Sequence, residues 1–241
     1  MIKDGISCEK NVKSILMIGQ SNMAGRGNVE DVEPIMNELC YMLRMGRWQK
    51  MREPINPDRS LYGKFRSGIS LAASFADEYA KKFNVSVGLI PCADGGTCIS
   101  QWMPGEILFD HAVFQTELAQ RTSELGAIIW HQGESDCHTE EDVWAYKEKF
   151  ITMMTELRSR ICAEKVPLII SELSENIASK YEVADRPRKL NKILHEIADE
   201  IPLCRVVSSK GLELKEDGLH FNSTSCREFG KRYFEEFLKL M

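Results

Sequence analysis

The chain has 241 residues, of which 43% are hydrophobic, so it is long enough to bury a large core, and we expect one α/β domain over residues 1–241. Its formal net charge of -5 argues against nucleic acid as a main partner, because phosphate binding needs a concentrated surplus of lysine and arginine. No apolar run approaches the roughly 20 residues that cross a bilayer, and the first residues lack the order of a signal peptide, so we expect a cytoplasmic protein with no membrane partner.

The chain alternates between short apolar runs and longer segments in which apolar residues have helical spacing. The apolar runs predict buried strands at residues 14–18, 85–91, 127–130, 167–171 and 203–207. The helical spacing predicts helices at residues 69–82, 112–125, 142–161, 188–200 and 225–240. Because parallel strands are usually joined by a helix, this alternation predicts a three-layer α/β/α fold with a doubly wound parallel sheet.

Residues 28–64 form the least regular part of the chain. Their sequence favours a short strand pair around residues 41–44 and 47–49 that turns at Gly46. We expect this segment to hold a loop at the active face of the sheet.

Eight cysteines are spread singly along the chain with no C-x-x-C pair, which predicts reduced, mostly buried thiols. No base motif accompanies Cys98, so we interpret it as a small buried thiol rather than a nucleophile. His131 and His138 match no known zinc spacing, and no metal site is predicted. The cysteines are Cys8, Cys40, Cys92, Cys98, Cys137, Cys162, Cys204 and Cys226.

Four polar loops are expected to meet at one edge of the sheet, because ligand sites in open parallel sheets lie outside the carboxyl ends of the strands. These loops are residues 19–25, 93–102, 131–136 and 216–222. Each has an ordinary structural explanation when taken alone, since a serine after a strand is usually a helix cap and Asp-Gly or Gly-Gly is usually a tight turn. Their convergence favours a catalytic site.

The loops hold the groups that nucleophilic acyl transfer requires. Ser21 is the candidate nucleophile, His220 is the candidate base, and Asp217 is placed to fix the tautomer of the imidazole. The nucleophile elbow G-x-S-x-G of α/β-hydrolases is not matched, because Met23 stands where its second glycine belongs.

The same loops offer hydrogen-bond donors for a developing oxyanion. The candidates are the backbone N–H groups of Ser21 and of Gly95 or Gly96, together with the side-chain amide of Gln132. Paired glycines leave backbone N–H groups free to approach a ligand closely. The choice between the two glycines stays open, with the first preferred.

Five further side chains in these loops are expected to bind substrate or to brace the loops. Gln20 and Asn22 are the amides on either side of Ser21. Glu134 and Arg26 are expected to pair and join the first and third loops, with a plain surface location as the alternative. Trp102 forms either an apolar wall or stacking surface of the site or part of the core.

Four motifs follow one another along the chain: GQSNMAGRG at residues 19–27, GGTCISQW at 95–102, WHQGESD at 130–136 and DGLHF at 217–221. Together they resemble the four sequence blocks of the SGNH hydrolase superfamily. Within it they look like the sialate O-acetylesterase-like and acetylxylan-esterase-like branch, the sixth carbohydrate esterase family. Four blocks in the right order are far more specific than any one of them.

The resemblance implies a flavodoxin-like fold and hydrolysis of acetyl esters, often on sugars, with no metal or other cofactor. By position, Ser21 matches the family's nucleophile and Asp217 and His220 match its last-block pair. One glycine of the second block matches an oxyanion donor. Gln132 stands where many SGNH hydrolases have asparagine.

The expected protein is therefore a serine esterase that acts on small-molecule or oligosaccharide acetyl esters. One alternative is a thioesterase or lipase-like SGNH hydrolase of other acyl esters. A long acyl chain would need an extended apolar groove, for which residues 28–64 are too polar. The other alternative is a non-catalytic carbohydrate-binding protein of the same fold, and the intact Ser21, Asp217 and His220 weigh against it.

Overall fold

The computed structural model describes residues 12–58, 66–177 and 179–241. Within these residues the chain forms a seven-stranded sheet in the order β3-β2-β4-β1-β5-β6-β7, parallel except for the β2–β3 pair. The strands are β1 (Val12–Gly19), β2 (Cys40–Arg44), β3 (Arg47–Lys50), β4 (Ser86–Pro91), β5 (Glu124–His131), β6 (Leu168–Ser171) and β7 (Cys204–Val207). The order β4-β1-β5-β6-β7 is flavodoxin-like, and it places the topological switch point at the carboxyl end of β1.

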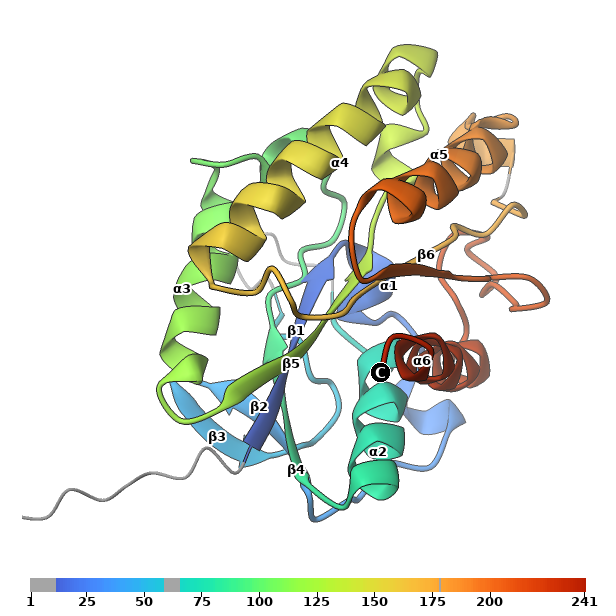
Figure 1. Ribbon diagram of the computed structural model, residues 1–241. Coiled ribbons are helices and arrows are strands. Elements are labelled where there is room, and N and C mark those ends of the chain that lie inside the picture. The colour runs from blue at the N-terminus through green and yellow to red at the C-terminus, as the bar shows by residue number, and fades with distance from the viewer. Residues whose placement is uncertain (1–11, 59–65, 178) are drawn as a thin grey trace, which may run out of the picture.

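Helices cover both faces of this sheet (Figure 1). On one face α2 and α6 pack against each other, and on the other face lie α3, α4 and α5. The helices are α1 (Ser21–Ala24), α2 (Leu71–Phe83), α3 (Ile107–Gln120), α4 (Glu140–Arg160), α5 (Arg186–Glu200) and α6 (Ser223–Leu238). The predicted three-layer, doubly wound α/β/α fold is confirmed. None of the helices in the described ranges is long and apolar enough to cross a membrane.

The side chains of β1 alternate between two buried cores. Leu16 and Ile18 belong to the core beneath α3, α4 and α5. Ile15 and Met17 belong to the core beneath α2 and α6. A strand covered on both faces needs apolar residues at every position, which is why the central strands are visible in the sequence as continuous apolar runs.

The predicted elements are found with shifted ends, and the helix expected at residues 112–125 differs most. α3 begins at Ile107 and ends at Gln120, and Leu125 belongs to β5. The buried face of α3 already includes Phe109, three residues before the predicted start, and continues with Ala112 and Val113. The predicted start was therefore about one turn too late.

The segment expected to hold a loop at the active face is described only in part, since residues 59–64 lie outside the described ranges. β2 extends the sheet beside β4, and β3 forms its edge. Asn56 Nδ2 donates to the backbone oxygen of Ala93 at 3.0 Å, and Ala93 N donates to Asn56 Oδ1 at 3.2 Å. Because Ala93 follows β4, this contact brings part of the segment to the carboxyl edge of the sheet.

The cysteines in the described ranges are unpaired, and five of the seven are buried. Cys162 is exposed, and Cys98 is partly exposed because it precedes a short helical turn (Ile99–Trp102) in a surface loop. The expectation that Cys98 is buried is therefore wrong. Cys8 lies outside the described residues.

Gly230 allows α6 to approach α2, since a Cβ there would lie 2.1 Å from the backbone oxygen of Leu71 and 3.0 Å from the backbone nitrogen of Phe75. Alanine usually stabilises a helix interior by about 1 kcal/mol relative to glycine. We expect Gly230→Ala instead to lower the free energy of unfolding by about 1–3 kcal/mol, because the helices must move apart. Urea unfolding measures this, with Lys231→Ala on the exposed side of α6 as a control that changes stability by less than about 0.5 kcal/mol. A Gly230→Ala protein as stable as wild type would contradict the close packing.

Candidate active site

Ser21 lies just after a sharp turn at the end of β1. Gly19 has a φ of 132°, and a Cβ there would lie 2.1 Å from the backbone oxygen of His131, so only glycine fits at this turn. Gln20 N donates to the same oxygen at 2.9 Å, and α1 begins with Ser21. The cap position of α1 is Gln20, so Ser21 is not the helix cap.

The loop before α6 brings His220 to Ser21 from 199 residues away in the sequence. His220 Nε2 lies 3.0 Å from Ser21 Oγ, and His220 Nδ1 lies 2.8 Å from Asp217 Oδ2. Asp217 Oδ1 accepts hydrogen bonds from the backbone N–H groups of Leu219 and His220, each at 2.9 Å. The three side chains that the sequence offered as nucleophile, base and orienting carboxylate therefore lie in hydrogen-bonding contact.

The surroundings of Asp217 favour its ionised form. Partial burial raises the pKa of Asp217, but the hydrogen bonds from His220 and from Leu219 N–H together hold that pKa below its ordinary value. An ionised carboxylate favours the tautomer that carries its proton on Nδ1. Nε2 is then free to accept a hydrogen bond from the Ser21 hydroxyl.

Asn22 clamps the His220 loop against α1. Its Nδ2 donates to the backbone oxygen of Leu219 at 3.3 Å, and its Oδ1 accepts from the backbone N–H of Phe221 at 3.1 Å. These are the two residues on either side of His220. Asn22 Nδ2 also donates to Glu134 Oε1 at 2.5 Å, which ties the clamp to the third loop. Asn22 thus braces the loops, one of the two roles expected for it.

Glu134 is held by buried groups rather than by Arg26. His131 Nε2 lies 3.0 Å from Glu134 Oε1, His131 Nδ1 lies 2.5 Å from Ser171 Oγ, and Tyr233 donates to that hydroxyl. Burial raises the pKa of Glu134, but His131 and Asn22 outweigh this effect and leave the pKa below its ordinary value. The expected pairing with Arg26 is corrected, since the hydrogen-bond partners of Glu134 are Asn22 and His131.

The Gln132 amide does not lie where an oxyanion donor was expected. The residue is fully buried, and its Nε2 donates to Thr97 O at 2.9 Å, Asp136 Oδ2 at 2.5 Å and Gln20 Oε1 at 3.2 Å. Its Oε1 accepts from the hydroxyl of Tyr146 at 3.0 Å. Because neighbouring acceptors occupy its N–H groups, Gln132 joins the second and third loops and does not line the cavity beside Ser21 and His220.

Gly95 lies directly against Ser21. A Cβ at Gly95 would stand 2.4 Å from Arg26 Nη2 and 3.4 Å from the Cβ of Ser21, so a side chain there would displace the guanidinium. Gly96 has a φ of 75°, and a Cβ there would meet open space. Residue 95 must be glycine because the Arg26 guanidinium lies where a Cβ would stand. At residue 96 the positive φ favours glycine, although there is room for a side chain.

Trp102 belongs to the core and not to the site. It is 1% exposed, its ring packs edge-on against Trp130 at 5.3 Å between centroids, and its Nε1 donates to Thr97 Oγ1 at 3.1 Å. The wall or stacking role considered for Trp102 is corrected accordingly. A tryptophan next to a predicted loop was ambiguous because tryptophan is common both in cores and at ligand sites.

A cavity of about 170 Å³ lies over Ser21 and His220. The sequence analysis assigned no catalytic or substrate-binding role to five of its lining residues: Ser135, His138, Tyr181, Val183 and Leu219. Tyr181 and Val183 follow β6, so only the rule that ligands gather at the carboxyl ends of strands could have pointed to them. Among the described residues, no group of three or more histidine, cysteine or acidic side chains is placed to hold a metal ion.

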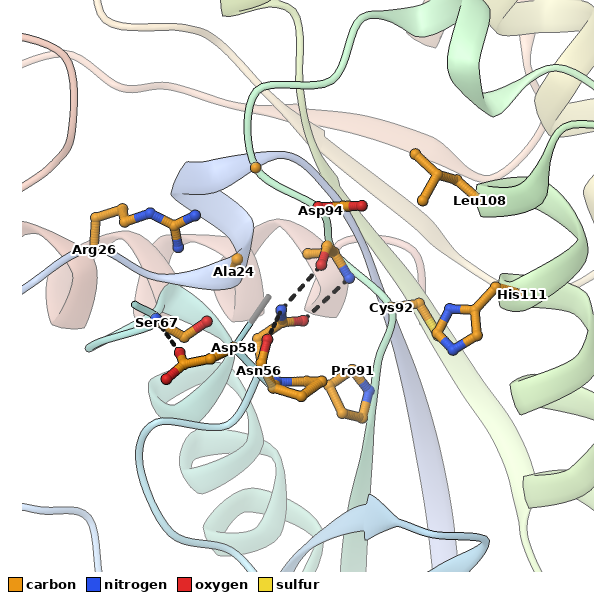
Figure 2. Close-up of a pocket in the computed structure, with 13 residues that line it drawn as sticks. Ala24, Arg26, Asn56, Asp58, Ser67, Pro91, Cys92, Asp94, Leu108 and His111 are labelled. Carbon is orange, nitrogen blue, oxygen red and sulfur yellow. Dashed lines mark hydrogen bonds between the residues drawn. The ribbon is translucent and has the colours of Figure 1, made fainter. Parts of the chain in front are cut away.

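A second cavity of about 170 Å³ adjoins the first, and the two share Arg26 and Gly95 as lining residues. Figure 2 shows Arg26 reaching from the end of α1 toward the loop that follows β4. The far side carries polar groups, including Asp58, which accepts from Ser67 N at 2.6 Å, and the imidazole of His111. The Arg26 guanidinium, which lies against Gly95, thus stands between the cavity at Ser21 and this second cavity, whose lining has a larger share of polar groups.

The sequence profile of the family described as "Carbohydrate esterase, sialic acid-specific acetylesterase" matches residues 11–239. The chain belongs to this carbohydrate esterase family. A probable carbohydrate esterase of Arabidopsis thaliana, At4g34215, is 28% identical to this esterase over 244 residues, which cover 92% of this chain and 89% of the relative. The crystal structure of the Arabidopsis protein matches with a TM-score of 0.83 and 25% identity over 95% of this chain and 98% of that chain.

Two further solved structures share the fold of this carbohydrate esterase. NanS matches with a TM-score of 0.76 and 15% identity, over 95% of this chain and 97% of that chain. XAC1771, a carbohydrate acetylesterase from Xanthomonas citri, matches with a TM-score of 0.58 and 17% identity, over 93% of this chain and 55% of that chain. At such identities the likeness shows the fold alone. Together with the family match, it confirms the resemblance to SGNH hydrolases that the four motifs indicated.

Asn22→Ala would remove both contacts to the His220 loop and one donor to the buried Glu134 carboxylate. We expect the free energy of unfolding to fall by about 2–3 kcal/mol, because a buried charged group is left less well hydrogen-bonded. Urea unfolding tests this, with Ser21→Ala on the same short helix as the control, since it removes one hydroxyl at a cost of about 1 kcal/mol or less. Equal stability of the two variants would contradict the clamp.

The raised pKa of Asp136 predicts that the free energy of unfolding falls as the pH rises. Both of its oxygens accept from Ile99 N, at 3.0 and 3.1 Å, and burial raises the pKa of Asp136 from 3.8 to about 6. The folded state therefore holds the proton more tightly than the unfolded chain. This stabilisation, about 3 kcal/mol, is complete below a pH of about 4 and is lost as the pH rises through about 6.

The measurement is urea unfolding of wild type and Asp136→Asn across this pH range. The wild type should lose stability relative to Asp136→Asn as the pH rises. A difference between the two proteins that stays constant with pH would contradict the raised pKa of Asp136.

Proposed function

We propose that this carbohydrate esterase hydrolyses O-acetyl esters on acetylated sugars, oligosaccharides or sialic acid through Ser21, His220 and Asp217. The observation that carries the proposal is the continuous line of hydrogen bonds from Ser21 Oγ to His220 Nε2 at 3.0 Å and from His220 Nδ1 to Asp217 Oδ2 at 2.8 Å. Nucleophile, base and orienting carboxylate in this contact are what an acyl-transfer site needs. Membership of the carbohydrate esterase family supports ester hydrolysis.

In the first step, His220 Nε2 takes the proton of the Ser21 hydroxyl while Oγ attacks the acetyl carbonyl carbon. The negative charge of Asp217 stabilises the imidazolium that forms. The electron pair of the carbonyl bond moves to oxygen, where the backbone N–H groups of Ser21 and of Gly95 or Gly96 stabilise it. His220 then gives its proton to the sugar oxygen, the ester C–O bond breaks, and the alcohol leaves with Ser21 acetylated.

In the second step, His220 takes a proton from water as the water oxygen attacks the acetyl carbon. The bond to Ser21 Oγ breaks, His220 returns the proton to Oγ, and acetic acid is released, which loses its proton to water to give acetate. The same imidazole transfers a proton to and from Ser21 Oγ in both steps, so both steps depend on its place between Ser21 and Asp217.

The dimensions of the site support a short acyl group. The cavity at Ser21 has a volume of about 170 Å³, below the range of about 300–1,000 Å³ that is usual for pockets holding larger ligands. Arg26 and Gly95 stand between it and the neighbouring cavity. A lipase-like or thioesterase function would need an extended apolar groove for a long acyl chain, and the charged and polar side chains of Arg26, Asp58 and His111 interrupt the apolar lining of the neighbouring cavity.

Ser21→Ala is expected to lower acetate release from acetylated carbohydrates at least about 10³-fold, because the nucleophile is lost. The assay uses acetylated sialic acid, xylo-oligosaccharide acetates and small acetyl esters, with released acetate as the readout. A fluorophosphonate probe should label wild type and leave Ser21→Ala unlabelled. Ser159→Ala, an exposed serine on α4, is the matched control and should keep both labelling and activity.

Three outcomes of this assay would contradict the proposal. Acetate release by Ser21→Ala at the wild-type rate would exclude Ser21 as the nucleophile. Wild type without labelling or activity would favour the non-catalytic carbohydrate-binding alternative. Faster turnover of p-nitrophenyl octanoate than of p-nitrophenyl acetate would favour the lipase-like alternative.

A further inference from the structure

The side-chain amide of Gln20, the residue before Ser21, has its oxygen fully engaged. Gln20 Oε1 accepts from Gln132 Nε2 at 3.2 Å and from the backbone N–H groups of Gly133 at 3.3 Å and Ser135 at 3.4 Å. Three donors around one carbonyl oxygen fix the direction of the amide, because the reversed amide would place N–H groups against N–H groups. The nitrogen end therefore has a fixed direction as well.

That nitrogen end is available to a ligand. Gln20 lines the same cavity as Ser21, Gly95 and Gly96. Gln20 is only 2% exposed, no acceptor within the described ranges takes a hydrogen bond from its Nε2, and this atom is not among the fully buried polar atoms that lack a partner, so Nε2 is the part of the side chain that reaches the cavity. An amide nitrogen carries two N–H donors. The cavity wall beside the nucleophile thus presents two oriented donors.

Gln132, the amide that the sequence predicted as an oxyanion donor, has no N–H group available to a ligand. Its two N–H groups are distributed among three acceptors on Gln20, Thr97 and Asp136, and it does not line the cavity. Turning Gln132 toward the cavity would leave the buried Asp136 carboxylate without one of its donors, at a cost of about 1–3 kcal/mol. Gln132 therefore acts on the site by holding Gln20 Oε1.

We propose that Gln20 is a catalytic residue whose Nε2 donates a hydrogen bond to the oxyanion, beside the backbone N–H groups of Ser21 and of the glycine pair. The inference rests on the proposed acyl transfer. No covalent bond to Gln20 forms or breaks, since the amide only stabilises the charge that moves onto the carbonyl oxygen. A donor held by three hydrogen bonds on its own oxygen needs no reorientation as this charge appears, which is the condition for strong electrostatic catalysis.

The test is Gln20→Glu, which keeps an oxygen for the three donors and replaces the cavity-facing N–H groups by a second oxygen. With p-nitrophenyl acetate we expect kcat to fall about 10²–10³-fold with KM changed only a few-fold, because an oxyanion donor acts in the transition state. Gln20→Ala should show a similar loss of kcat. Gln49→Glu, the same charge change on exposed β3, is the matched control and should keep wild-type kinetics.

A measurement on wild type makes the test independent of how well the variants fold. A phosphonate bound to Ser21 places an oxygen where the oxyanion forms, so the side-chain N–H signals of Gln20 in a ¹⁵N–¹H spectrum should move downfield on labelling. Unmoved signals, or a folded Gln20→Glu protein with kcat within a few-fold of wild type, would overturn the assignment to Gln20. A wild type that neither turns over p-nitrophenyl acetate nor reacts with the phosphonate would instead refute the proposed function.

Discussion

The hydrogen bond between Ser21 Oγ and His220 Nε2 is the contact on which the rest of the site depends. It joins two residues that are 199 positions apart in the sequence, Ser21 in the turn after β1 and His220 in the loop before α6. The sheet order places β4 and β5 on opposite sides of β1, so the loops after all three strands meet around Ser21. Gly19 makes the turn into α1 tight enough to expose the hydroxyl at this point.

The positions of Ser21 and His220 are maintained by polar groups that reach deep into the core. Asn22 holds both neighbours of His220, Glu134 holds Asn22, and His131 connects Glu134 to Ser171 on β6. Buried polar chains of this kind stabilise one arrangement only when nearly every member has its partner. The loop that carries His220 therefore shares its stability with the sheet and with α6. A substitution far from Ser21 can in this way alter the contact between serine and imidazole.

Much of this arrangement could be predicted from the sequence, for reasons that particular residues make clear. The central strands were visible because β1 is covered on both faces, so Ile15 to Ile18 are all apolar. Asp217 and His220 were visible because a carboxylate three residues before a histidine can reach its ring within one turn. The family resemblance then placed them with Ser21 in the order expected for SGNH hydrolases.

The remaining features depend on contacts that no local pattern encodes. The amides of Gln20 and Gln132 are chemically alike, and only the surrounding donors and acceptors decide which nitrogen faces the cavity. Glu134 was expected to pair with Arg26 because the guanidinium offers a rigid fork to a carboxylate. In the fold, the buried side chains of Asn22 and His131 take that place. Tyr181 reaches the site from a segment without a motif.

The most direct measurement of the central claim is to trap the acyl-enzyme. Wild-type protein is mixed with excess p-nitrophenyl acetate, quenched in acid before the first turnover is complete, and digested for mass spectrometry. The account predicts the added mass of one acetyl group on the peptide that contains Ser21, and its absence when His220 is replaced by alanine. Hydrolysis that proceeds with no acetyl group on this peptide, or with the acetyl group on another side chain, would contradict the account.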